Sequence, residues 1–171
     1  HRVDRRQRQM CIRDRYYEFE IHPYFVKAFK KRWYVIAYSP GTDDIRCYAL
    51  DRMEDVTISE EVFKMPEDLD PVEYFKDCFG IINIKGAEVQ KVLLRVDGFQ
   101  SNYIRNLPLH SSQKEIKHTD EYSIFEYHLK PELDFEQEIF SNMDTMEVLE
   151  PQWLREEIAQ RLKNLTGKYQ I

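Results

Sequence analysis

Apolar and polar positions alternate along the first half of the chain in the way that predicts β-strands. Phe19 and Ile21 alternate with charged neighbours, and Pro23 limits where that strand can lie in a sheet. Residues 33–38 are almost wholly apolar, with aromatic and branched side chains, which is typical of a strand buried on both faces. Turn formers fill residues 39–44. A first strand is predicted to begin at residue 16, and further strands are predicted over residues 33–38, 45–50 and 51–58.

The second half alternates between strand and helix patterns. Val92, Leu94 and Val96 recur at every second position, as in a strand with one buried face. The terminal helix has Pro151 near its start, leucines and isoleucine at helical spacing, and Gly167 past its expected end. The predicted order is strand 89–96, helix 101–107, strands 113–118 and 122–129, helix 133–142, strand 146–149 and the terminal helix. This βαββαβ order predicts a ferredoxin-like domain over residues 87–171, with helices on one face of the sheet.

Between the two halves, residues 60–86 are rich in acids and contain Pro66 and Pro71. We therefore interpret them as a linker. Asp70 is placed to cap a short helix that begins at Pro71 and ends before Gly80.

Composition narrows the class of protein. With 42% hydrophobic and 33% charged residues in 171, the chain is typical of a globular protein, and no apolar run has membrane-spanning length. The three cysteines, Cys11, Cys47 and Cys78, have no C-x-x-C spacing, which argues against a structural zinc site and a disulfide framework. We therefore expect a cytoplasmic protein with no metal, no cofactor and no membrane partner.

The net charge of −6 is unevenly spread. Residues 1–15 hold six arginines and two aspartates, so they carry +4 and the remaining residues carry −10. A basic arm of this kind can bind nucleic acid. It also resembles a translated cloning scar, because it has no apolar period and no helix cap. We predict that residues 1–15 are non-native or disordered and that the natural protein extends upstream.

Three blocks, His22–Phe25, Arg32–Tyr38 and Ile45–Met53, resemble in order and spacing the WYL domain of bacterial transcription regulators. Two later stretches, Leu109–Gln113 and Val148–Glu156, resemble the carboxy-terminal extension called WCX that follows such domains. The resemblance covers nearly all of residues 16–171.

The resemblance implies a ligand-sensing Sm-like, SH3-type small β-barrel over residues 16–59. It also implies an upstream helix-turn-helix domain that binds DNA and is missing here. The fold class expected is thus α+β, a small barrel followed by the ferredoxin-like domain with its terminal helix. Three positions depart from the family pattern: Val35 replaces the last letter of the name motif, Met53 replaces isoleucine, and Ala49 stands where a basic residue is frequent.

Arg46 and Arg52 are six positions apart, so an unbroken strand would place both on one face together with Tyr48. Guanidinium groups beside tyrosine rings suit a planar anionic ligand, which they bind through phosphate and base. Spacing alone favours the alternative that nearby acids pair with both arginines; the resemblance favours the ligand site. Tyr34 and His22 complete the predicted site, although His22 is equally well explained as a structural residue.

Trp33 is predicted to lie in the core. No residue pattern supplies a nucleophile with its base, or a glycine-rich phosphate loop, so no enzyme is expected.

Two functional hypotheses remain. In the first, the chain is the ligand-sensing part of a transcription regulator and binds a negatively charged nucleotide or single-stranded nucleic acid in the WYL barrel. In the second, it is a dimerisation or interaction module without a small ligand, and its aromatic-rich surface is the interface. The partners expected are that ligand, DNA through the missing upstream domain, and a second copy in a homodimer.

Overall fold

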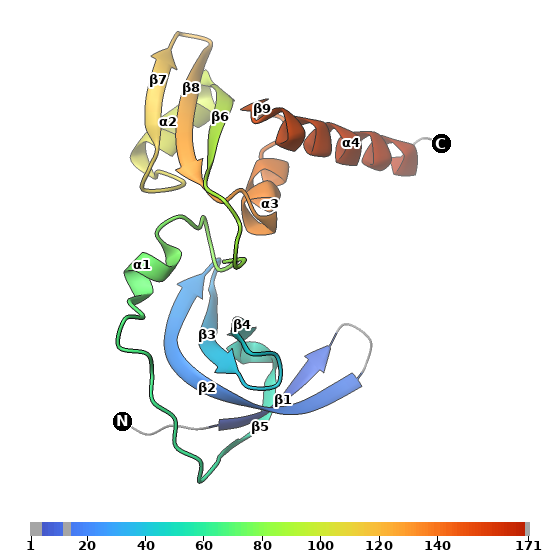
Figure 1. The fold of residues 1–171 in the computed structure, drawn as a ribbon. Helices are drawn as coiled ribbons and strands as arrows, with labels where there is room; N and C mark the ends of the chain where they lie inside the picture. Colours follow the sequence, from blue (N-terminus) through green and yellow to red (C-terminus); the bar gives the residue numbers. More distant parts are fainter. Residues whose placement is uncertain (1–4, 12–14, 170–171) are drawn as a thin grey trace. The chain divides into compact units, whose positions relative to one another are not determined.

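The computed structural model describes the backbone of residues 5–11 and 15–169 and the side chains from residue 18 onward. The protein is a mixed α+β structure with two antiparallel sheets and a C-terminal helix (Figure 1). Its chain divides after Tyr74 into a first and a second compact unit. Among the residues described, no helix combines the length and the apolar character needed to cross a membrane.

The first unit is a five-stranded sheet. Its strands are β1 (Arg5–Cys11), β2 (Arg15–Phe29), β3 (Arg32–Ser39), β4 (Asp44–Ala49) and β5 (Met53–Ile58), in the order β4-β3-β2-β1-β5. The long, strongly curved β2 pairs with β1 through its first half and with β3 through its second half (Figure 1). The register shifts between Pro23 and Phe25, where proline lacks the N–H that a regular ladder needs.

The basic N-terminal segment contributes a strand to the first sheet. Strand β1 lies within residues 1–15, and its backbone pairs with both β2 and β5. Ladder pairing uses backbone groups alone, so the missing side-chain alternation does not prevent it. Residues 1–4 and 12–14 lie outside the described part. Whether the segment belongs to the natural protein stays a prediction.

The core of the first unit lies on one face of the sheet. Ile21, Val35, Ala37 and Tyr48 are buried together, with Phe19 and Met53 packed against them. Ile36 is buried on the opposite face, so the centre of β3 is buried on both faces, as the sequence predicts.

The acidic linker divides between the two units. Asp70 caps α1 (Pro71–Phe75) by accepting hydrogen bonds from the backbone N–H groups of Val72 and Glu73, at 2.7 and 2.9 Å. Beyond α1 the chain is bound to the second unit, because Asp134 Oδ2 accepts hydrogen bonds from Ile81 N and Ile82 N. The boundary therefore falls inside the predicted linker 60–86.

The second unit has a four-stranded sheet in the order β7-β8-β6-β9. Its elements are β6 (Gln90–Asp97), α2 (Gly98–Asn106), β7 (Lys114–His118), β8 (Tyr122–Leu129), α3 (Leu133–Ser141), β9 (Met146–Glu150) and α4 (Gln152–Tyr169). The core comprises Val92, Leu94, Val96, Ile104, Phe125, Tyr127, Leu129, Phe135, Ile139, Met146, Val148, Leu154 and Ile158. Helix α4 continues through Gly167, contrary to the prediction, because glycine lowers helix stability by only about 1 kcal/mol.

Gly98 marks a close approach between α2 and the β7–β8 turn. A Cβ atom at this position would lie 2.8 Å from the carbonyl oxygen of Asp120. Gly98→Ala is expected to lower the free energy of unfolding by about 1 kcal/mol, because backbone must shift to relieve the overlap. Thermal unfolding of both proteins measures this effect. Gly167→Ala is the control: its Cβ would meet no atom within 4 Å, so alanine should stabilise α4.

Candidate ligand-binding site

Arg46 and Tyr48 lie on the same face of β4. In the β3–β4 ladder Arg46 is opposite Ala37 and Tyr48 is opposite Val35, and residues directly opposite each other share a face. Tyr48 is buried in the core, whereas Arg46 is exposed. This face therefore passes from a buried aromatic residue to a guanidinium group in contact with solvent.

Arg52 does not occupy the position that strand alternation predicts for it. Strand β4 ends at Ala49, and Leu50–Arg52 form a 3-10 turn before β5. The even spacing between Arg46 and Arg52 therefore does not place them on one strand face, because the strand between them is broken. Arg52 is exposed in this turn.

The acidic side chains nearest in sequence do not neutralise these arginines. Asp51 contacts Arg32 instead, with 3.5 Å between the carboxylate Oδ2 and the guanidinium Nε. Among the side chains that the structure describes, neither Arg46 nor Arg52 makes an ion pair or a hydrogen bond. The pairing alternative considered from sequence is therefore not observed within residues 18–169.

Tyr34 and His22 lie on the opposite face from Arg46 and Tyr48. Tyr34 is opposite Ala49 on β4, and His22 is opposite Tyr38 on β3. The ladder thus brings Arg46 and Tyr48 together and separates them from Tyr34 and His22.

Aromatic rings already contact His22. Its imidazole stacks on Phe63 with 4.6 Å between ring centroids and an interplanar angle of 8°, and it lies 5.5 Å from the ring of Tyr38. The Tyr38 hydroxyl donates a hydrogen bond to Asp43 Oδ1 at 2.8 Å, which raises the pKa of Tyr38. These contacts support the structural interpretation of His22.

Sequence reasoning was wrong about Trp33. Its side chain is 57% exposed and lies near the β2–β3 turn rather than in the core. The signal that would have identified this hairpin is its density of charge, since Lys27, Lys30, Lys31 and Arg32 surround it.

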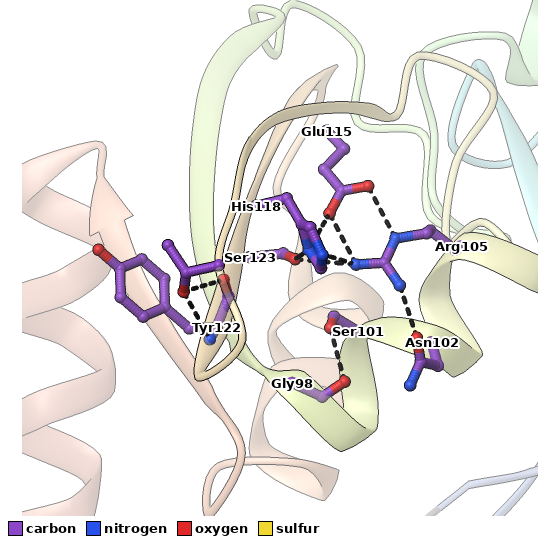
Figure 2. A network of polar contacts seen from close by, with 9 residues as sticks. Gly98, Ser101, Asn102, Arg105, Glu115, His118, Tyr122 and Ser123 are labelled. Carbon is purple, nitrogen blue, oxygen red and sulfur yellow. Dashed lines mark hydrogen bonds and ion pairs between the residues drawn. The ribbon is translucent and has the colours of Figure 1, made fainter.

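The clearest polar network belongs to the second unit. Arg105 of α2 donates hydrogen bonds from two nitrogens to both carboxylate oxygens of Glu115 on β7 (Figure 2), and each of these bonds is 2.8 Å long. Arg105 Nη2 also donates to Ser123 Oγ at 3.0 Å and lies 2.9 Å from His118 Nδ1. Its hydrogen bonds hold the pKa of Glu115 at about 2. The network joins α2 to β7 and β8 and is structural, because the guanidinium group of Arg105 binds Glu115, Ser123 and Asn102 at once.

The remaining candidates for chemistry have structural partners. His110 is buried, with Nε2 2.9 Å from the backbone oxygen of Lys76 and Nδ1 2.8 Å from Ser112 Oγ. Within the described residues there is no cluster of three side chains suited to hold a metal ion.

Comparison with family models identifies both units. The WYL domain model matches residues 7–58, and the WCX domain model matches residues 88–166. This pair of domains defines a regulatory module of transcription regulators. The chain belongs to the family of proteins that combine a WYL domain with a WCX domain.

Two solved structures are similar to this chain. Proteasome accessory factor B/C (PafBC) of Arthrobacter aurescens is 16% identical with a TM-score of 0.40, and the match covers 94% of this chain and 24% of that one. A CRISPR Cas-related protein is 12% identical with a TM-score of 0.58, over 98% of this chain and 47% of the other. The chain thus spans less than half the length of either protein. No curated protein matched.

Proposed function

We propose that this chain is the ligand-sensing part of a transcription regulator and that its WYL domain binds a negatively charged nucleotide or single-stranded nucleic acid. The observation that carries the proposal is that Arg46 shares a face with Tyr48 and, like Arg52, is exposed without an acidic partner among the described side chains. Guanidinium groups bind phosphate through two parallel hydrogen bonds. Tyr34 and His22 belong to the opposite face, so we give them no direct part in phosphate binding.

We further propose the finer fold assignments. The strand order β4-β3-β2-β1-β5 and the shared, curved β2 support a small Sm-like, SH3-type barrel. The order β6-α2-β7-β8-α3-β9 supports a ferredoxin-like second unit. The proposal places the protein in the cytoplasm, assigns it no enzymatic activity, and expects DNA binding from an upstream domain.

The test is a double substitution, Arg46→Ala with Arg52→Ala. We expect the affinity for a fluorescent oligothymidylate of about a dozen nucleotides to fall about tenfold at low salt, because two charge-assisted contacts to phosphate are lost. Fluorescence polarisation titrations measure the change. The control is Lys163→Ala with Lys168→Ala, which removes the same charge from exposed positions of α4. Equal binding by the parent and the arginine variant would reject these residues as the site.

A separate observation favours dimerisation as a second function. Phe99, Tyr103 and Leu107 are 75%, 58% and 79% exposed, at four-residue spacing on α2 and its C-cap. Four-residue spacing places them on one side of the helix, as in many helix–helix contacts. Sedimentation equilibrium tests this candidate directly, and a monomer at high concentration would remove it.

A further inference from the structure

The β2–β3 hairpin is a basic surface on an acidic protein. Residues 23–42 contain Lys27, Lys30, Lys31 and Arg32 and no aspartate or glutamate, whereas the whole chain has a net charge of −6. All four cations lie within six consecutive positions around the turn between β2 and β3. Arg32 is paired with Asp51 at 3.5 Å, so the three lysines supply the excess positive charge of the hairpin. Such a local field attracts a polyanion even when the rest of the molecule repels it.

An exposed apolar surface accompanies the charge. Trp33 is 57% exposed, and Val26 near the same end of β2 is 56% exposed. Trp33 is opposite Ala28 and lies two positions from Val35, so it shares the sheet face that carries Tyr48 and Arg46. An exposed indole next to cations provides a stacking surface for an unpaired base.

Two lysines occupy the turn between β2 and β3 in a backbone conformation that is unfavourable for them. Lys30 and Lys31 have φ values of 43° and 66°, both in the left-handed region that two-residue hairpin turns fill best with Asn-Gly. Here two long cationic side chains occupy those positions instead. Lys30 Nζ lies 5.6 Å from the centroid of the Phe29 ring. The hairpin therefore presents positive charge where a more stable turn sequence is available.

We infer that residues 26–33, the hairpin surface, bind the backbone and one base of a single-stranded nucleic acid. This inference rests on the proposed function and selects one of its two ligand classes, a single-stranded nucleic acid rather than a nucleotide. Trp33 lies four residues from Ala37 on β3, and Ala37 is the ladder partner of Arg46. Four residues span about 13 Å along a strand, so this distance separates Trp33 from the position of Arg46. One nucleotide adds only about 3.4 Å along a duplex strand, so contact with both places requires several nucleotides.

A single strand suits this surface better than a duplex. Bases of a duplex are stacked inside it and cannot lie on the exposed indole, whereas unstacked bases of a single strand can. The WYL domain is therefore expected to bind an oligonucleotide more tightly than a mononucleotide, and a single strand more tightly than the corresponding duplex.

The first experiment changes the turn to its most favourable sequence, Lys30→Asn with Lys31→Gly. This variant is expected to unfold at a higher temperature than the parent, so a loss of binding cannot reflect misfolding. We expect about tenfold weaker binding of the oligothymidylate and a salt slope reduced by about 1.4, since each phosphate contact on a single strand contributes about 0.7. The control is Lys163→Asn with Lys168→Asn, which removes equal charge from α4 and should bind like the parent.

The second experiment uses Trp33 as a reporter. In a Trp153→Phe chain, Trp33 is the only tryptophan. The oligothymidylate is expected to quench its fluorescence, and Trp33→Ala is expected to weaken binding about fivefold or more through lost stacking. Thymidine monophosphate, which is too short to contact both places, should leave the emission nearly unchanged at concentrations that saturate the oligonucleotide.

The outcomes separate this inference from the proposed function. If the arginine variant loses binding but the turn variant and Trp33→Ala do not, the proposed site stands and the hairpin surface is rejected. If only the turn variant and Trp33→Ala lose binding, the hairpin surface stands and the Arg46 site is rejected. Equal losses in the turn variant and its α4 control, or equal affinity for duplex and single strand, would also overturn the inference.

Discussion

Phe135→Ala is expected to lower the free energy of unfolding of the second unit by about 3–5 kcal/mol. Phe135 is fully buried, and its ring lies 5.5 Å from that of Phe79 and 6.1 Å from that of Tyr127, both in edge-to-face arrangements. Removing the ring leaves a cavity between α3, the sheet and the segment that follows α1. Strand and helix backbones cannot collapse into it without losing their own hydrogen bonds. Urea denaturation followed by far-UV circular dichroism measures the loss.

The matched control is Phe99→Ala on α2. Phe99 is 75% exposed, so the same truncation is expected to change the free energy of unfolding by less than about 1 kcal/mol. Similar losses in the two variants would show that Phe135 is not part of a close-packed core.

The second unit could be predicted well because its sheet has one covered face. Val92, Leu94 and Val96 are buried while Lys91, Arg95 and Asp97 between and beside them are exposed, so the period of two is visible in the sequence. The first unit was harder to predict. Strand β1 consists mainly of arginine and glutamine and pairs through its backbone, which leaves no apolar period for sequence reasoning to detect.

The proposed binding site was only partly predictable. Leu50 continues the apolar pattern of β4, so the pattern predicts an unbroken strand as far as Arg52. The 3-10 turn that interrupts this strand follows from the return of the chain to β5. Strand alternation places Tyr34 and Tyr38 on the other face of β3 from Trp33. Alternation does not show which end of β3 the core covers. The core includes Val35 but does not extend to Trp33, so Trp33 is exposed to solvent.

Arg105→Met is expected to destabilise the second unit by about 1.5–3 kcal/mol at neutral pH. Methionine keeps the apolar stem but removes both hydrogen bonds to Glu115, whose side chain is only 24% exposed. It also removes the bond to the buried Ser123 hydroxyl. The cost arises mainly from leaving a half-buried carboxylate without its cation. Urea denaturation of the two proteins at pH 7 gives the difference.

The pH dependence of that difference identifies Glu115 as the responsible group. Its pKa is about 2 in the folded protein against an ordinary value of 4.5, chiefly because of the hydrogen bonds from Arg105. A folded pKa below the unfolded value gives stability that is complete above pH 4.5 and is lost as the pH falls towards 2. The advantage of the parent over Arg105→Met should therefore shrink across this window. With Glu115→Gln present in both proteins, the cost of Arg105→Met should no longer depend on pH in this window. A difference between parent and Arg105→Met that stays constant down to pH 2 would mean that Arg105 stabilises the fold through Ser123 and Asn102 rather than through Glu115.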